Sequence, residues 1–274
     1  MSGVSIPYGY AATIGAVPGA SRVAMLGNNP SIDTLTQPED VWSGAELGTL
    51  NGIDHKFIPR PQGVAVSMEV VSSSALDTAA GTGARTVTID YLDAAYAAQS
   101  VVLTLNGVTP VALPVPVRRV NGLRVSSSGT FGGNNAGNLS VRLAGGLGAT
   151  FAYARAGNGL ARSSLYTVPA GQTLDIYSMV LAINRADTQD RWASFALCIQ
   201  NAAGNLIKGI ELPASTMVPY RQENLNVPSV IVPATSDVWW RCEAVSQNNT
   251  NVTGAYAGIV RTGVPFLGRF GLSG

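Results

Sequence analysis

The sequence predicts an all-β protein with little helix: an extended N-terminal arm followed by two β-sandwich units of the Ig-like or jelly-roll-like kind. Three observations lead to this prediction. Apolar residues alternate with small or polar residues in short runs, as in half-buried strands. Turn signals recur about every eight to twelve residues, as in sandwiches. No segment keeps a helical period for about ten residues or more.

Residues 1–63 are predicted to form the arm. Proline recurs there, and each proline removes a backbone donor and disfavours helix before it. The arm also carries Tyr8, Tyr10, Trp42 and Phe57, which a solvated linker would avoid. An irregular segment with aromatic anchors is expected to order along a partner, and these four residues are therefore candidates for a subunit interface. The alternative is that the arm packs back on its own domain.

Residues 64–160 are predicted to form the first sandwich. Val64, Val66, Met68 and Val70 alternate with small or polar residues, which is typical of a strand. The dipeptides at 106–107 and 121–122 are both Asn-Gly, and both predict tight turns because these residues tolerate positive φ. Prolines at 114 and 116 restrict the run 111–117 to a sheet edge or a connection. Residues 129–137 are predicted to be a polar loop.

Residues 161–262 are predicted to form the second sandwich or jelly roll, with six to eight short strands. Trp239 and Trp240 are adjacent in a strand, which places one indole on each face. One is expected in the core, and Trp239 is a candidate for a partner interface or a sheet edge. Residues 263–274 are predicted to be a C-terminal tail that makes a second contact through Phe266 and Phe270.

Charge is sparse. Only 12% of the 274 residues are charged, against about 25% in an average soluble domain. The net charge of +1 argues against a dedicated nucleic-acid binder, and no apolar run is long enough to cross a membrane. Because charge normally keeps a free surface solvated, the composition predicts a chain covered by other subunits. Arg118 and Arg119, with Arg124 close by, are expected to meet an acidic patch on a neighbouring subunit.

The sequence offers little for catalysis, and we predict no catalytic residue, cofactor or metal. His55 is the only histidine, which excludes multi-histidine metal sites, and it is expected on the arm surface. The charged run 185–191, with Asp187 and Asp190, is predicted to be a solvated loop; a calcium loop or a glycosidase site is the alternative. Cys198 and Cys242 are expected to be buried free thiols, although a disulfide between them stays open.

Several phrases of the sequence resemble tailed-bacteriophage virion structural proteins, such as capsid decoration and head-tail associated β-proteins. The resemblance spans about residues 27–262 and rests on these stretches: PEDVWSG at 38–44, EVVSSS at 69–74, DTAAGTGARTV at 77–87, TLNGVTPV at 104–111, NAGNL at 135–139 and YTVPAGQTL at 166–174. It implies a virion component and no catalytic residues.

The expected function is therefore that of a non-enzymatic capsid decoration (cement) protein. It would be a homotrimer that binds the major capsid protein or other virion proteins, without nucleic acid or membrane. The N-terminus shows no secretory signal, so we expect assembly into the virion in the host bacterial cytoplasm. The alternatives are a tail, baseplate or fibre protein that binds a host-surface glycan and, less favoured, a polysaccharide depolymerase.

Overall fold

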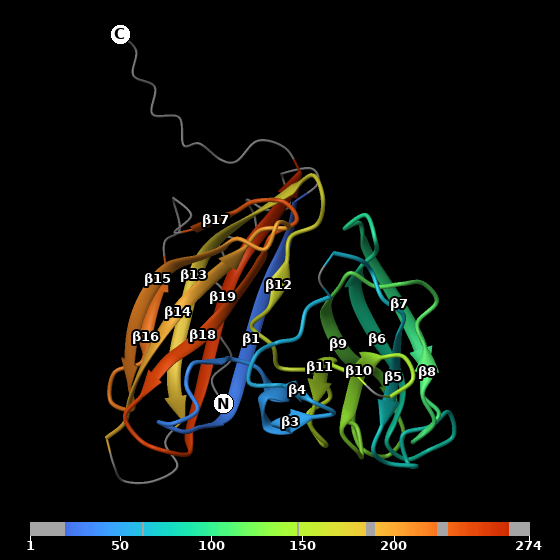
Figure 1. The fold of residues 1–274 in the computed structure, drawn as a ribbon. Helices are drawn as coiled ribbons and strands as arrows, with labels where there is room; N and C mark the ends of the chain where they lie inside the picture. Colours follow the sequence, from blue (N-terminus) through green and yellow to red (C-terminus); the bar gives the residue numbers. More distant parts are fainter. Residues whose placement is uncertain (1–19, 62, 147, 185–189, 224–229, 263–274) are drawn as a thin grey trace.

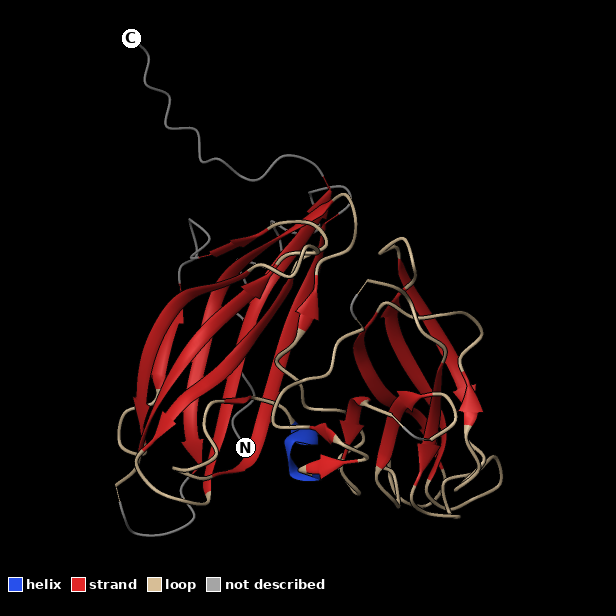
Figure 2. Ribbon diagram, viewed as in Figure 1, coloured by secondary structure: helices blue, strands red, loops and turns tan. Residues whose placement is uncertain are grey.

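The prediction of an all-β fold is confirmed by a computed structural model that describes residues 20–61, 63–146, 148–184, 190–223 and 230–262. Within those ranges, antiparallel sheets make up nearly all regular structure (Figure 2). The only helix there is the short 3-10 turn η1 (Ser43–Leu47). None of the described helical structure is long and apolar enough to cross a membrane.

Two sandwiches lie side by side (Figure 1). The larger one packs two sheets around a core that contains Phe195, Trp240 and Tyr256. Its first sheet has the order β1 (Ala20–Ile32), β19 (Thr250–Thr262), β13 (Gln172–Asn184) and β16 (Tyr220–Glu223), with β17 (Val230–Val232) also on β13. Its second sheet has the order β12 (Tyr166–Thr167), β18 (Asp237–Val245), β14 (Trp192–Gln200) and β15 (Leu206–Ser215), with β2 (Glu39–Asp40) also on β18.

The smaller sandwich has a core of its own, which contains Val70, Ile89, Leu123 and Val141. One sheet has the order β11 (Thr150–Ala154), β10 (Leu139–Leu143), β5 (Met68–Ser72) and β8 (Val111–Ala112). The other has the order β7 (Ala98–Thr104), β6 (Ala84–Leu92) and β9 (Arg119–Ser128). The short β8 is an edge strand, as the nearby prolines predict.

The prediction of an extended arm is wrong for the described part of residues 1–63. Residues 20–32 form β1, which pairs with β19 from Ala20↔Arg261 to Ile32↔Thr250. The physical reason is alternation, because Val23 and Met25 pack against the core of the larger sandwich. The smaller sandwich is thus inserted into the larger one, between the N-terminal strands and β12 (Figure 1).

The bridging segment, residues 33–61, joins β1 to the smaller sandwich. It contains β2, η1 and a small hairpin of β3 (Thr49–Leu50) and β4 (Ile53–Asp54). Trp42 and Ile58 from this segment pack with Trp239 and Cys198 of the larger sandwich and Tyr153 of the smaller one. This third core covers the outer side of the β18–β14 pair. The segment therefore packs on its own chain, which was the alternative to contact with another subunit.

Candidate assembly surface

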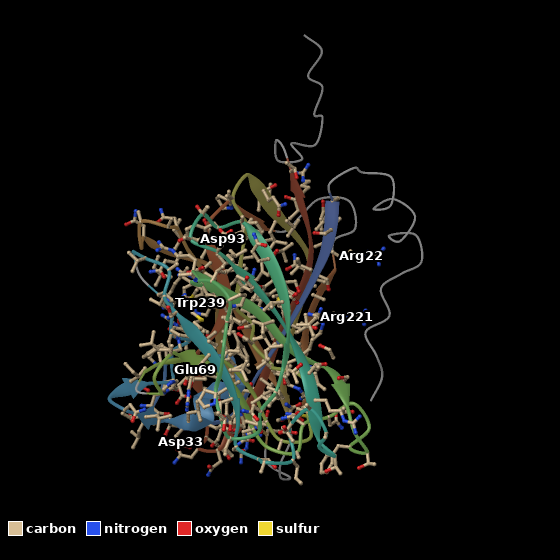
Figure 3. All side chains as sticks on the ribbon, turned by 90° about the vertical axis from the view of Figure 1, so that its right-hand side faces the viewer. Arg22, Asp33, Glu69, Asp93, Arg221 and Trp239 are labelled. Atoms are coloured by element: carbon tan, nitrogen blue, oxygen red, sulfur yellow. The ribbon has the colours of Figure 1, made fainter. Side chains whose placement is uncertain are left out.

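Trp42 and Trp239 were candidates for contact with another subunit, and the structure corrects this, because both side chains are fully buried within the chain. The Trp239 indole donates a hydrogen bond to Asp40 Oδ1 at 2.8 Å, and the Arg60 guanidinium lies 3.9 Å from the centre of its ring. Figure 3 shows Trp239 within the body of the molecule. The prediction that the two tryptophans at 239–240 occupy opposite faces is confirmed, since Trp240 packs in the main core.

Arg118 and Arg119 are also buried, so the expected acidic patch on a neighbouring subunit is wrong for them. Arg119 forms a forked ion pair with Asp237: Nε donates to Oδ1 at 2.9 Å and Nη2 to Oδ2 at 2.9 Å. Arg118 Nε donates to the Tyr96 hydroxyl at 3.0 Å. Their partners belong to the same chain, as does Asp90, the ion-pair partner of Arg124.

Of the predicted interface residues that the structure describes, Phe57 alone keeps substantial exposure, at 37%. The Arg241 guanidinium lies 5.3 Å from the centre of its ring. Tyr8, Tyr10, Phe266 and Phe270 lie outside the described residues, so their contacts with partners stay predictions.

His55 is fully buried, and its expected place on the arm surface is wrong. Its Nδ1 lies 3.2 Å from the Gly48 carbonyl oxygen, and its Nε2 accepts a hydrogen bond from the Thr150 amide at 3.1 Å. The ring stacks on Trp42, with 6.2 Å between the ring centres. Burial lowers the pKa of His55 and keeps the ring neutral, so it serves as a structural link.

The remaining chemically active groups are dispersed. Asp175 is buried beside Arg261, with 2.6 Å between Oδ2 and Nε, and burial raises the pKa of the carboxyl. Asp190 is exposed, whereas Asp187 lies outside the described residues. Cys198 and Cys242 are buried free thiols, as expected, and burial raises their pKa values to about 11 and about 12. The described residues hold no cluster of three or more His, Cys, Asp or Glu side chains fit for a metal ion.

The clearest surface feature is a group of large apolar side chains at one end of the larger sandwich, which we call the apolar loop end. Its four members are largely exposed: Leu35 at 93%, Trp192 at 52%, Met217 at 72% and Val218 at 70%. Monomeric proteins seldom expose such groups together, and tryptophan and methionine are enriched where protein interfaces form.

Backbone and side-chain hydrogen bonds bring these residues to one end of the fold. The loop that carries Leu35 is tied to the β18–β19 turn, because the Thr34 amide donates to Asn248 Oδ1 at 2.9 Å. Trp192 shares two hydrogen bonds with Ser246 at the start of the same turn. The Thr216 amide donates to the Arg191 carbonyl at 2.9 Å, which places Met217 beside the start of β14.

Arg191 helps to hold this end together. Its Nη1 donates to the carbonyl oxygens of Asn248 at 2.8 Å and Asn249 at 2.9 Å. The residue is buried, so its cation braces the turn from inside and leaves the apolar side chains outermost.

The apolar loop end was not predicted from the sequence, although a signal for Trp192 existed. Ala193, Phe195 and Leu197 all point into the core, so alternation along β14 places Trp192 on the opposite face. Leu35, by contrast, gives no such signal, because a single leucine in a polar turn has no period.

Comparison with known proteins adds little. No protein-family model matches the sequence, and no curated protein matches it. A structure of infectious bursal disease virus, Gx strain, is 8% identical, with 92% of this chain and 74% of that chain covered and a TM-score of 0.20. The VP2 subviral particle of the same virus is 9% identical, with 90% and 73% covered and a TM-score of 0.20. At these scores the likeness carries no argument about fold or function.

Proposed function

We propose that this chain is a non-enzymatic structural subunit of a virus particle, and specifically a capsid decoration (cement) protein of a tailed bacteriophage that acts as an oligomer. The observation that carries the proposal is the apolar loop end, where Leu35, Trp192, Met217 and Val218 are exposed together. The sequence resemblance to tailed-bacteriophage virion proteins supports the choice of a phage particle.

The mechanism is burial of apolar surface at junctions between subunits. An interface of standard size buries about 800 Å² on each partner. At about 25 cal/mol per Å² of apolar surface, its gross driving force is on the order of 10 kcal/mol or more. Much of this is offset by lost rigid-body and side-chain freedom, so the most deeply buried aromatic anchors decide the affinity. The small charged fraction of 12% favours this use, since few ions must be desolvated.

The test is sedimentation of the purified protein with heads of the phage that encodes it, after the heads are stripped of their own copies. We expect Trp192→Ser combined with Met217→Ser to weaken binding by at least tenfold, about 1.4 kcal/mol. The matched control is Val102→Ser on β7, because Val102 is 61% exposed but belongs to the smaller sandwich. Equal binding of the double variant and the control would contradict the proposal.

Copy number separates the alternatives. Hundreds of copies in each particle support a shell protein, whereas a handful to a few dozen support a tail, baseplate or fibre protein. In that second case free protein should attach to host cells and block infection, with the exposed loops as the recognition surface. Release of oligosaccharide from host polysaccharide would instead assign a depolymerase.

A further inference from the structure

The backbone of β7 is paired on one side only. β7 ends the β7–β6–β9 sheet, and its ladder with β6 runs without a register shift. At one end of this ladder the Leu105 amide donates to the Arg85 carbonyl at 2.9 Å. At the other end the Asp93 amide donates to the Ala97 carbonyl at 3.1 Å. Because hydrogen-bonded pairs alternate with non-hydrogen-bonded pairs in an antiparallel ladder, the odd-numbered residues of β7 are the ones that bond to β6.

The even-numbered residues of β7 therefore direct their N–H and C=O groups away from β6. These residues are Ala98, Ser100, Val102 and Thr104, and all four are exposed. In the described ranges no further strand and no isolated bridge pairs with this edge. The edge thus presents a row of donors and acceptors at the spacing that another extended strand matches.

No side chain of β7 blocks such pairing. Its sequence, AQSVVLT, contains no charged residue, proline or glycine. Val101 and Leu103 pack against the core of the smaller sandwich, so alternation places the even-numbered side chains on the outer face, where Val102 is 61% exposed. Natural proteins usually protect an exposed edge strand with a lysine, a proline or a bulge. β7 has none of these, so its edge is open to another strand.

β15, the edge strand of the second sheet of the larger sandwich, carries all three protections. Lys208 is exposed on it, the pairing register with β14 shifts at Gly209, and Pro213 lacks a backbone donor. The far edge of β7's own sheet is protected in another way, because the Val125 amide on β9 donates to the Gly159 carbonyl at 2.7 Å. The contrast singles out β7 as an edge where pairing with another chain is tolerated.

A second copy of β7 fits this edge. Only even-numbered residues offer outward groups, so the hydrogen-bonded pairs must join even to even. An antiparallel pairing with its two-fold axis at Val102 places Val102 opposite Val102 of the second copy and Ser100 opposite Thr104. On the core side of the sheet, the same register places Val101 opposite Leu103. Each pair joins polar with polar or apolar with apolar, and no like charges meet.

The edge also lies on an accessible side of the molecule. β7 is on the side of the smaller sandwich that faces away from the larger one (Figure 1). β8 ends the other sheet on the same side, and the residues Val108 and Val115 that flank it are 61% and 41% exposed. A second copy can therefore reach β7 and cover these apolar side chains as well.

We propose that two copies of this chain form a two-fold dimer by antiparallel pairing of their β7 edges, with the axis at Val102. The pairing joins two three-stranded sheets into one continuous sheet across the dimer. This inference goes beyond the virion function proposed above and does not rest on it, because β7 belongs to the smaller sandwich and the apolar loop end to the larger one.

The test is analytical ultracentrifugation of the purified full chain over a dilution series, without phage heads. We expect a species of twice the 28.3 kDa chain mass. Ser100→Lys combined with Thr104→Lys places like charges opposite each other in the proposed register and should raise the dissociation constant at least tenfold. Ser100→Lys combined with Thr104→Glu changes the same two positions but places opposite charges across the interface, so it should restore the dimer.

Ile207→Lys on β15 is the control for a charge added at a different edge, since Ile207 is 61% exposed, and it should leave the dissociation constant unchanged. Val102→Ser alters no backbone group and adds no charge, so it should keep the dimer. Circular dichroism checks that every variant is folded.

A monomer at every concentration would overturn the proposal and leave the edge to a strand of a different protein. Equal association of the two double variants, or equal weakening by Ile207→Lys, would overturn the β7 register. Because no heads are present, each of these results leaves the test of the virion function unaffected.

Discussion

Burial determines the protonation and the tautomer of His55. The Gly48 carbonyl can only accept, so the hydrogen must sit on Nδ1, and the Thr150 amide can only donate, so Nε2 must offer its lone pair. A protonated ring would leave the Thr150 amide facing a second N–H group. The neutral ring therefore belongs to the folded state, which agrees with the lowered pKa.

The lowered pKa of His55 predicts that the protein loses stability in mild acid. Because the pKa of His55 is lower in the folded state than its ordinary value near 6.5, the unfolded chain binds the proton first. The contribution of the neutral His55 ring to the free energy of unfolding is complete above about pH 6.5. It is lost as the pH falls from about 6.5 toward the pKa of His55 in the folded state. Urea unfolding at pH 7.5 and at lower pH measures it.

His55→Asn is the control for that pH dependence. It should cost about 1–3 kcal/mol at pH 7.5, the usual cost of a buried hydrogen bond left unmade, and should flatten the slope below pH 6.5. Subtracting the stability–pH curve of His55→Asn from that of the unchanged protein cancels the contribution of the carboxylates. These include Glu39, whose pKa is raised by burial. An equal slope in both proteins would contradict the role of His55.

At the scale of single elements, the two Asn-Gly dipeptides adopt different structures. Gly107 adopts φ +59 in a turn, as Asn106-Gly107 predicts, although β7 and β8 then join different sheets. The other Asn-Gly pair is not a turn, because Asn121 and Gly122 lie inside β9. Asn121 instead holds the backbone of Thr167 on β12 through two hydrogen bonds of 2.9 Å, a tertiary contact that overrides local preference.

The bridging segment is an element whose stability depends on Trp42. Trp42→Ala should lower the free energy of unfolding by about 3–5 kcal/mol, because it empties a buried indole site. Phe57→Ala in the same segment is the matched control and should cost clearly less, since that ring is 37% exposed. Chemical denaturation followed by circular dichroism compares them, and equal losses would contradict the packing described here.

At the scale of the whole molecule, the two sandwiches are joined by a buried polar network. Arg119 on β9 pairs with Asp237 on β18 and donates to the Pro61 carbonyl at 2.6 Å, and the Thr167 hydroxyl donates to Asp237 at 2.6 Å. Residues 1–63 cannot be deleted to test docking on a particle, because that change also removes β1 and Trp42. Truncation must stop before Ala20.

Removing the buried Arg119–Asp237 ion pair tests how strongly this network holds the two sandwiches together. Arg119→Met should destabilise the protein by about 3–5 kcal/mol, because it leaves the buried Asp237 carboxylate without its cation. Arg124 lies on the same strand as Arg119, and Arg124→Met removes its exposed ion pair with Asp90 on β6, so this change should cost about 1 kcal/mol or less. Thermal and denaturant unfolding measure both, and similar costs would contradict the proposed importance of burial.

The sequence by itself determined the all-β class and the opposite faces of Trp239 and Trp240, because alternation along a strand is a local property. It did not show what covers Trp239, that Arg119 meets Asp237, or that Leu35 and Trp192 share one end of the fold. Those outcomes join residues more than a hundred positions apart. Only the tertiary structure decided them, because a side chain reaches its partner through the pairing of whole strands, and the sequence of neither strand alone specifies that pairing.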